Sequence, residues 1–244
     1  MRIFPSESTV VVTGAARGQG AAHAARLGRP GVRVILTDVL DDEGERTTEV
    51  LRSSGVDAHY RSLDVSVPEQ WSALAEEIRR DQPRLTGLVN NAGILRYGSI
   101  ETTDLATWSL HERINVHGTF LGVQTMAPLM RNGGGGSIVN VASTAALIGS
   151  KGYAAYSASK AAIVALTKVA AHEFSPTVRI NAISPGGVSS QMNNDEPEGG
   201  SSSSAPLGRR ASVEEISPLI DYLLSDQASF VTGSNVVIDG GLTA

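Results

Sequence analysis

The sequence predicts one α/β domain built on a doubly wound parallel sheet of seven strands, with helices on both faces. Three observations lead to this fold class. Strand-like and helix-like segments alternate, each strand-like segment is almost continuously apolar, and the alternation is unbroken from the first strand to the last. A chain of 244 residues could hold one large or two small domains, and the unbroken alternation favours a single domain over residues 1–244.

The first 65 residues alternate most clearly. Residues 8–14, "STVVVTG", form a β-branched run that ends in glycine, as expected of a strand, and the alanine-rich residues 19–28 are typical of a helix. Residues 32–38, "VRVILTD", again indicate a strand. A charged helix at 41–54 and a strand at 56–65 complete this part of the chain.

The same order continues to the end of the chain. The further elements expected are a helix at 68–80, a strand at 85–91, a long helix at about 104–131, a strand at 136–143, a helix at about 153–174, a strand at 177–184, a helix at about 213–225 and a last strand at 235–239.

Two segments interrupt this order. We expect "NGGGG" at 132–136 to be a flexible link into the next strand. Residues 192–206, "MNNDEPEGGSSSSAP", are polar and low in complexity. They could form a disordered surface loop. Because they follow the C-terminal end of a strand, where open α/β sheets bind ligands, they could also belong to a flexible substrate lid at about 187–208.

Composition narrows the class of protein. A formal charge of −5 argues against a nucleic-acid partner, and no apolar run approaches the roughly 18 residues of a membrane span. The chain has no cysteine, so it forms no disulfide or thiolate metal site, which fits a cytoplasmic protein. Residues 1–13 lack the features of a signal peptide. The five histidines lack metal-ligand spacing, so we predict no metal site and expect them to be structural or exposed.

A glycine-rich loop, "TGAARGQG" at 13–20, stands between the first strand and the first helix. Gly14 permits a tight turn, Gly18 lets the backbone approach a pyrophosphate, and Gly20 lets helix and strand pack closely. The helix N-terminus then offers N–H groups and a positive dipole to the anion. This context predicts a dinucleotide site.

An acid follows at the end of the second strand, at Asp38. A carboxylate there accepts hydrogen bonds from ribose hydroxyls and repels a 2′-phosphate, so it favours NAD over NADP. Arg17 favours the opposite choice, because a guanidinium could pair with that phosphate. We give Asp38 more weight, since Arg17 can turn towards solvent. Asp38 could also serve only as a turn residue.

The segment "YAAYSASK" at 153–160 contains two tyrosines and a lysine. Residues four apart share a helix face, so Tyr156 and Lys160 are neighbours, whereas Tyr153 lies roughly 10 Å from Lys160 along the axis. A nearby ammonium should lower the pKa of a phenol from about 10 towards neutral pH. We therefore predict Tyr156 as the acid/base, with Tyr153 as a pocket wall or a core residue.

The whole chain resembles the short-chain dehydrogenase/reductase superfamily. The glycines are spaced Gly-x3-Gly-x-Gly, and seven further motifs follow in order: "LDV" (63–65), "NNAG" (90–93), "IN" (114–115), "IVNVAS" (138–143), "YSASK" (156–160), "INAISPG" (180–186) and "VTGSNVVIDGG" (231–241). The resemblance implies a Rossmann fold and an NAD-dependent oxidoreductase.

The resemblance also implies roles for single residues. Ser143 would bind the substrate oxygen, Asn115 would hold a water through its backbone in a proton relay, and Lys160 would bridge the nicotinamide ribose. The implied cofactor contacts are Gly14, Arg17, Gly18, Gln19, Gly20, Asp38, Val39, Asp64, Val65, Asn91, Ala92, Gly93, Tyr156, Lys160, Pro185, Gly186, Val188 and Ser189.

The expected substrate is a secondary alcohol or ketone. The pocket residues that we expect are mostly apolar or small, which suits a hydrophobic or alicyclic substrate: Ile94, Leu95, Thr144, Ala145, Leu147, Tyr153 and Gly187. The C-terminal part resembles hydroxysteroid dehydrogenases. A 3-oxoacyl-carrier-protein reductase and a catalytically silent dinucleotide-binding regulator are the alternatives. The family is commonly tetrameric, so a homotetramer is expected.

Overall fold

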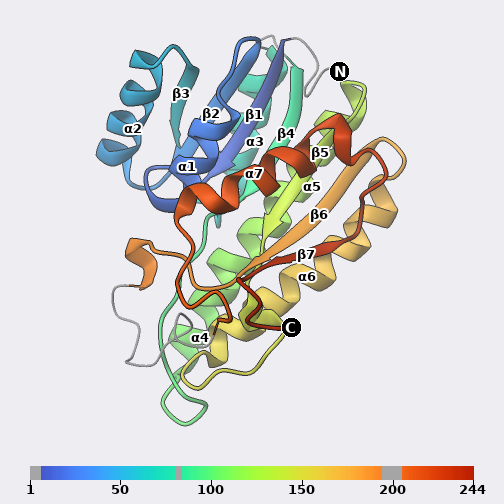
Figure 1. Ribbon diagram of the computed structural model, residues 1–244. Helices are drawn as coiled ribbons and strands as arrows, with labels where there is room; N and C mark the ends of the chain where they lie inside the picture. Colours follow the sequence, from blue (N-terminus) through green and yellow to red (C-terminus); the bar gives the residue numbers. More distant parts are fainter. Residues whose placement is uncertain (1–6, 81–83, 194–204) are drawn as a thin grey trace.

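The computed structural model describes residues 7–80, 84–193 and 205–244. Its strands form one seven-stranded parallel sheet in the order β3-β2-β1-β4-β5-β6-β7 (Figure 1), which confirms the predicted fold class. The strands are β1 (Ser8–Thr13), β2 (Val32–Asp38), β3 (Asp57–Ser62), β4 (Arg84–Asn90), β5 (Gly136–Val141), β6 (Val178–Pro185) and β7 (Asn235–Ile238).

Helices cover both faces of this sheet. The α-helices are α1 (Gly18–Leu27), α2 (Asp41–Ser53), α3 (Pro68–Arg80), α4 (Leu105–His111), α5 (Gly118–Asn132), α6 (Ala154–Phe174) and α7 (Val213–Leu224), of which α4 packs against α6. Figure 1 shows α1 and α7 side by side across the front of the sheet, with α3 and α5 behind it. A Ser212–Glu215 capping box begins α7, as expected when serine precedes a helix and glutamate follows three residues later.

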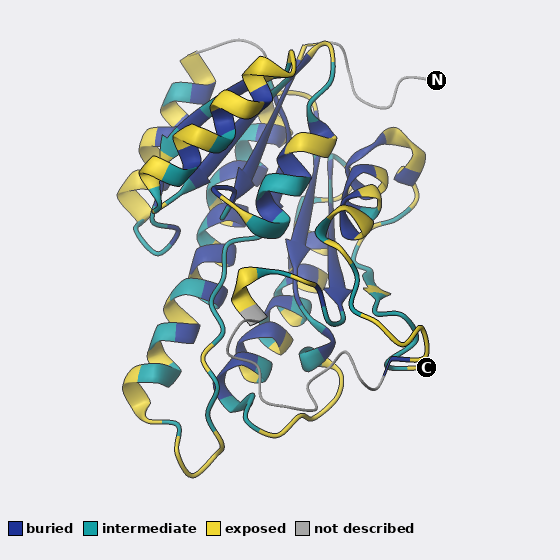
Figure 2. Cartoon of the chain, turned by 60° about the vertical axis from the view of Figure 1, so that its left-hand side comes forward, coloured by how far each residue is buried: buried dark blue, intermediate teal, exposed yellow. Residues whose placement is uncertain are grey.

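The two faces of the sheet build two hydrophobic cores. Successive residues of a strand point to opposite faces. Accordingly, Val10 and Val12 join the core under α1 and α7, whereas Val11 joins the core under α3 and α5. All six residues of β1 are buried, and Figure 2 shows buried strands between helices whose outer faces are exposed. Burial on both faces explains why the strand segments lack polar alternation.

The long helix expected at 104–131 contains a change of helix type. After α4, residues Glu112–His117 form a π-helix, and α5 follows without a break. The order of apolar residues in the sequence does not reveal this π-helix, because its wider turn moves the following apolar positions by only one residue. Single-turn π segments are frequent at functional sites.

The expected flexible link at 132–136 is instead a compact turn. The N–H of Gly135 donates to the carbonyl of Met130 (2.8 Å), and β5 begins at the next residue. Gly134 and Gly135 have φ values of +95° and +112°, which side chains disfavour. The glycines therefore serve backbone geometry.

Half of the proposed lid at about 187–208, namely residues 194–204, lies outside the described residues. The two described segments that flank it are joined to each other. The N–H of Ser189 donates to the carbonyl of Ala211, and the N–H of Ala211 donates to the carbonyl of Gly187, both at 2.9 Å. The base of this segment is thus closed by backbone hydrogen bonds beside the end of β6.

Across the described parts of the chain, no helix has both the length and the apolar character that crossing a membrane requires.

Candidate active site

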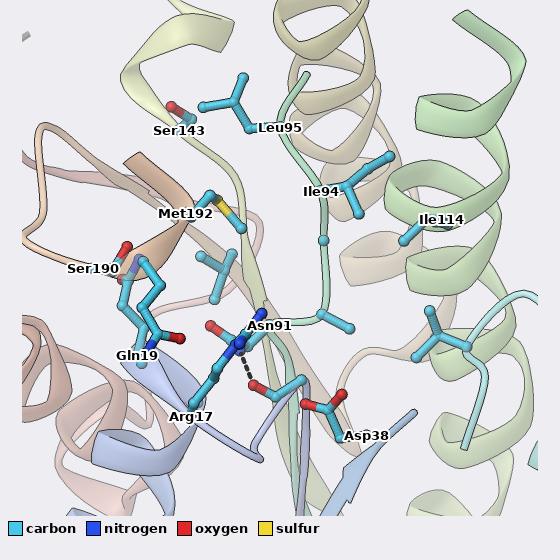
Figure 3. Close-up of a pocket in the computed structure, with 18 of the residues that line it drawn as sticks. Arg17, Gln19, Asp38, Asn91, Ile94, Leu95, Ile114, Ser143, Ser190 and Met192 are labelled. Atoms are coloured by element: carbon cyan, nitrogen blue, oxygen red, sulfur yellow. Dashed lines mark hydrogen bonds between the residues drawn. The ribbon is translucent and has the colours of Figure 1, made fainter. Parts of the chain in front are cut away.

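A pocket of about 610 Å³ lies at the carboxyl ends of the strands, around the point where the strand order reverses between β1 and β4 (Figure 3). This is where open α/β sheets bind ligands, and the volume suits a small-molecule or cofactor site. The predicted site residues that line it are Gly14, Arg17, Gly18, Gln19, Gly20, Asp38, Val39, Asp64, Val65, Asn91, Ala92, Gly93, Ser143, Tyr156, Lys160, Pro185, Gly186 and Val188.

Two predicted site residues do not line the pocket. Ser189 is exposed, and its neighbour Ser190 lines the pocket instead. Asn115 is fully buried behind the wall. Of the predicted substrate-pocket residues, Ile94 and Leu95 line the pocket, whereas Thr144, Ala145, Leu147, Tyr153 and Gly187 do not.

Sequence reasoning missed several lining residues. They are Leu40, Leu63, Arg96, Ile114, Val141, Ala142, Ser190, Gln191 and Met192. Most are direct neighbours of predicted residues. Several of them already lie inside the quoted motifs "LDV", "IN" and "IVNVAS", so including the neighbours of each predicted residue would have found them. Gln191 and Met192 fall within the possible substrate lid at about 187–208, but no motif marks them as single site residues.

The glycine-rich loop between β1 and α1 packs backbone against backbone. Gly14 has a φ of +63°, and a Cβ on it would lie 2.8 Å from the Cα of Ala92. A Cβ on Gly20 would lie 2.1 Å from the carbonyl oxygen of Gly14. No real Cβ approaches a backbone atom that closely, so both positions require glycine.

The first turn of α1 offers a cradle for an anion. Arg17 at the N-cap makes no side-chain capping bond, and Gly18, Gln19 and Gly20 all line the pocket. Gln19 Oε1 is buried without a hydrogen-bond partner among the described residues. Because an uncapped helix N-terminus attracts negative charge, these residues fit the pyrophosphate of a dinucleotide.

Asp38 is both a turn residue and a wall of the pocket. Its Oδ2 accepts a hydrogen bond from the N–H of Ala16 (3.0 Å), and its Oδ1 accepts from those of Val39 (2.8 Å) and Leu40 (3.2 Å). The carboxylate thereby ties the glycine-rich loop to the end of β2. Since a carboxylate offers about four acceptor sites, one remains for a ribose hydroxyl.

Arg17, the residue that would favour a 2′-phosphate, is paired with an acid. Its Nη1 lies 3.5 Å from Oε2 of Glu43 on α2, and both side chains are partly exposed. This neighbour reduces the positive charge that Arg17 can offer to a ligand.

Tyr156, Lys160 and Ser143 meet at the other end of the pocket. Tyr156 and Lys160 lie one turn apart on α6, and both are buried. Ser143 is the second residue after the end of β5. Lys160 Nζ donates to the carbonyl of Val141 (2.8 Å) and lies 5.7 Å from the centre of the Tyr156 ring. The predicted pair is therefore brought together over the end of β5.

The expectation that the pKa of Tyr156 is lowered is wrong. Burial raises the pKa of Tyr156 to about 12, and hydrogen bonding with Ser143 only partly opposes this rise. Burial also lowers the pKa of Lys160 to about 8. The physical reason is that desolvation penalises both charged forms, while Lys160 Nζ is directed to a carbonyl and the ring face rather than to the phenol oxygen.

The Asn115 side chain lies in the π-helix and holds the chain after β4. Its Oδ1 accepts from the N–H of Ile94 (2.8 Å), and its Nδ2 donates to the carbonyl of Ile94 (3.1 Å) and to Ser159 Oγ (2.9 Å). Its backbone carbonyl accepts from Thr119 Oγ1 (2.8 Å). The relay role implied for that carbonyl stays a prediction.

Gly93 explains how Asn115 and Lys160 can lie so near each other. A Cβ on Gly93 would lie 3.1 Å from Asn115 Oδ1 and 3.4 Å from Lys160 Nζ. The missing side chain leaves room for both polar groups beside the pocket wall.

Tyr153 packs in an aromatic cluster next to Tyr156. Its ring meets that of Tyr97 edge-on, with centres 5.2 Å apart, and lies 6.2 Å from that of Tyr156. Such edge-to-face pairs stabilise packing. Tyr153 is half-buried and is not among the residues that line the pocket, and its role as a pocket wall or a core residue stays a prediction.

The five histidines are dispersed. His23 and His111 are fully buried, His59 pairs with Asp57, and His117 and His172 are exposed. In the described parts of the chain, no three histidine, aspartate or glutamate side chains gather closely enough to hold a metal ion.

Comparison with known proteins gives a family and close relatives. The family model described as "Enoyl-(Acyl carrier protein) reductase" matches residues 14–243. The chain is 40% identical to a trans-4-hydroxycyclohexanecarboxylate dehydrogenase of Sinomonas cyclohexanicum, over 98% of this chain and 94% of that protein. It is 39% identical to a 3-alpha-(or 20-beta)-hydroxysteroid dehydrogenase of Mycobacterium tuberculosis, over 96% and 88%.

A solved structure with the same fold is that of a gluconate 5-dehydrogenase from Burkholderia cenocepacia, in complex with NADP and tartrate. It aligns with a TM-score of 0.92 at 27% identity and covers 99% of this chain and 97% of that one. That structure contains NADP, so the shared fold by itself does not decide between NAD and NADP.

Proposed function

Because the chain belongs to the short-chain dehydrogenase/reductase family, we propose that it transfers hydride between NAD(H) and a secondary alcohol or ketone of hydrophobic or alicyclic type. The observation that carries this proposal is one continuous pocket, with a glycine-lined helix N-terminus at one end and Ser143, Tyr156 and Lys160 at the other. Two relatives named for alicyclic hydroxy compounds support the substrate class.

The residues of this chain divide the work between binding and proton handling. Gly14, Gly18 and Gly20 would admit the pyrophosphate, and Asp38 would bind the adenosine ribose. NAD, when bound, supplies the hydride acceptor in oxidation. Ser143 donates a hydrogen bond to the substrate oxygen, and Tyr156 exchanges a proton with that oxygen.

The buried phenol is protonated at neutral pH, because burial raises its pKa to about 12. In this form Tyr156 can donate a proton to a ketone as the alcohol forms. Oxidation needs the reverse transfer, so the alcohol proton must leave through Tyr156 towards a base. Lys160, whose pKa is lowered to about 8 by burial, is the nearby group that can become neutral. Because its Nζ is directed to the Val141 carbonyl and the ring face, the proton would reach it through the water relay implied for Asn115.

We propose NAD rather than NADP as the cofactor. The Asp38 carboxylate lines the pocket beside the loop and would repel a 2′-phosphate. Arg17, the residue that could offset this repulsion, is paired with Glu43.

A homotetramer in the cytoplasm is proposed by family resemblance. Exposed apolar side chains on α5, α6 and β7, including Phe120, Val169 and Val237, are consistent with self-association, and a monomeric mass in solution would contradict it.

A substrate panel tests the proposed function. Absorbance at 340 nm is followed with cyclic alcohols, 4-hydroxycyclohexanecarboxylate, hydroxysteroids, acyl thioesters and sugars, each with NAD and with NADP. We expect turnover of alicyclic alcohols, with a kcat/KM at least about tenfold higher for NAD. Turnover restricted to acyl thioesters would favour the reductase alternative. Tight NAD binding without any turnover would favour a silent regulator.

The kinetic pH profile should report the Lys160–Tyr156 pair. We expect kcat/KM for alcohol oxidation to rise with pH through about 8, because Lys160 becomes neutral there and can accept the proton. The Lys160→Met variant should lose this rise together with most activity. A flat wild-type profile from pH 6.5 to 9.5 would contradict the assignment.

A further inference from the structure

We infer that His111 is a positioning residue for this reaction, holding the pocket segment Ile94–Arg96 beside the ring of Tyr156. The inference rests on the proposed function only for its kinetic consequences. It adds a residue that neither the glycine-rich loop nor the Ser143, Tyr156 and Lys160 set includes.

Both ring nitrogens of His111 are engaged. His111 ends α4 and is fully buried. Its Nδ1–H donates to the carbonyl of Thr107 (2.9 Å), and its Nε2 accepts from the backbone N–H of Arg96 (3.1 Å). A carbonyl can only accept and a backbone N–H can only donate, so the neutral Nδ1–H tautomer is required.

His111 and Asn115 together hold the segment that follows β4. They lie four residues apart across the junction of α4 and the π-helix, and both contact this segment. Asn115 binds both backbone groups of Ile94, and His111 binds the N–H of Arg96. The side chains of Asn115 and His111 thus supply hydrogen bonds to the backbone of this segment, as an adjacent strand does within a sheet. His111 adds a hydrogen bond at Arg96, between the bonds of Ile94 to Asn115 and the tie at Gly98, whose N–H donates to the carbonyl of Gly152 (2.8 Å).

The same imidazole contacts the ring of Tyr156. The two ring centres are 6.4 Å apart and the planes meet at 76°, an edge-to-face contact. Tyr156 is packed on another side by Tyr153 at 6.2 Å. His111 therefore touches both the residue proposed to move the proton and the segment that lines the substrate end of the pocket.

A pair of amide variants separates the hydrogen bond from general packing. Glutamine in His111→Gln can place an oxygen where Nε2 lies, whereas asparagine in His111→Asn reaches only the Nδ1 position. We expect His111→Gln to keep kcat/KM for the alcohol within about threefold of the wild type. We expect His111→Asn to lower it about tenfold, with the Kd for NADH unchanged, because the Arg96 N–H loses its acceptor.

The buried residue His23 offers a matched control. Its Nδ1 lies 2.9 Å from Ser217 Oγ, between α1 and α7 and away from the pocket lining. His23→Ala removes this hydrogen bond together with the packing of the ring, so it should lower the melting temperature while leaving kcat/KM unchanged. If His111→Asn acted only by destabilising the fold, the His23 variant would lower kcat/KM as well. A loss of kcat/KM confined to the His111 variant therefore indicates positioning.

Hydrogen exchange gives a readout that does not depend on turnover. Peptides covering residues 94–97 should exchange faster in His111→Asn than in His111→Gln. If the wild type turned over no alcohol, the proposed function would fail, yet this difference would still support positioning by His111. Equal exchange in the two variants, or equal kcat/KM, would overturn the inference.

Discussion

Replacing Tyr156 with phenylalanine is expected to lower kcat by about 10²–10⁴-fold while leaving the Kd for NADH within about twofold of the wild type. The ring keeps its packing against His111 and Tyr153, so the variant removes only the hydroxyl that exchanges the proton. Steady-state kinetics with the best alcohol of the panel and fluorescence titration with NADH measure the two quantities.

Tyr153→Phe is the matched control for this prediction. Tyr153 lies in the same aromatic cluster but does not line the pocket, so losing its hydroxyl should change kcat by no more than a few fold. Full activity in Tyr156→Phe, or equal losses in both variants, would remove Tyr156 from the mechanism.

Adding one methyl group at Gly20 is expected to abolish cofactor binding at ordinary concentrations. In Gly20→Ala the Cβ would lie 2.1 Å from the carbonyl oxygen of Gly14 and 2.7 Å from Asn91 Nδ2. The first turn of α1 must then move away from the glycine-rich loop at Gly14. We expect the Kd for NADH to rise by about 10²-fold or more, and the free energy of unfolding to fall by about 1–3 kcal/mol.

Gly149→Ala is the control for the Gly20 variant. A Cβ on Gly149 would meet no atom within 4 Å, and its φ does not require glycine. Its melting temperature and Kd for NADH should match the wild type. If Gly20→Ala also bound NADH normally, the glycine-rich loop would not be the dinucleotide cradle.

Much of the fold could be predicted because both faces of the sheet are covered. Continuous apolar runs such as Val10–Val12 identify buried strands without any three-dimensional information. The spacing of Tyr156 and Lys160 likewise predicts their proximity, since a regular helix converts four residues into one turn.

Other features depend on the environment that folding creates. The pKa of Tyr156 is raised because the ring becomes buried, and the motif alone does not reveal how far desolvation outweighs a nearby ammonium. The π-helix at Glu112–His117 and the inward position of Ser190 instead of Ser189 depend on single-residue shifts, which hydrophobic patterns do not resolve. His111 carries no motif at all.

The hydrogen bonds that join Gly187, Ser189 and Ala211 bear on how such an enzyme could acquire new substrates. These backbone hydrogen bonds hold the two ends of the intervening chain together next to the pocket. The entropy of closing a loop grows only slowly with its length, by about 0.6 kcal/mol per doubling. Insertions, deletions or grafted segments between these two anchors should therefore be tolerated by the sheet. This gives evolution and protein engineering a place to vary specificity while the hydride-transfer chemistry stays intact.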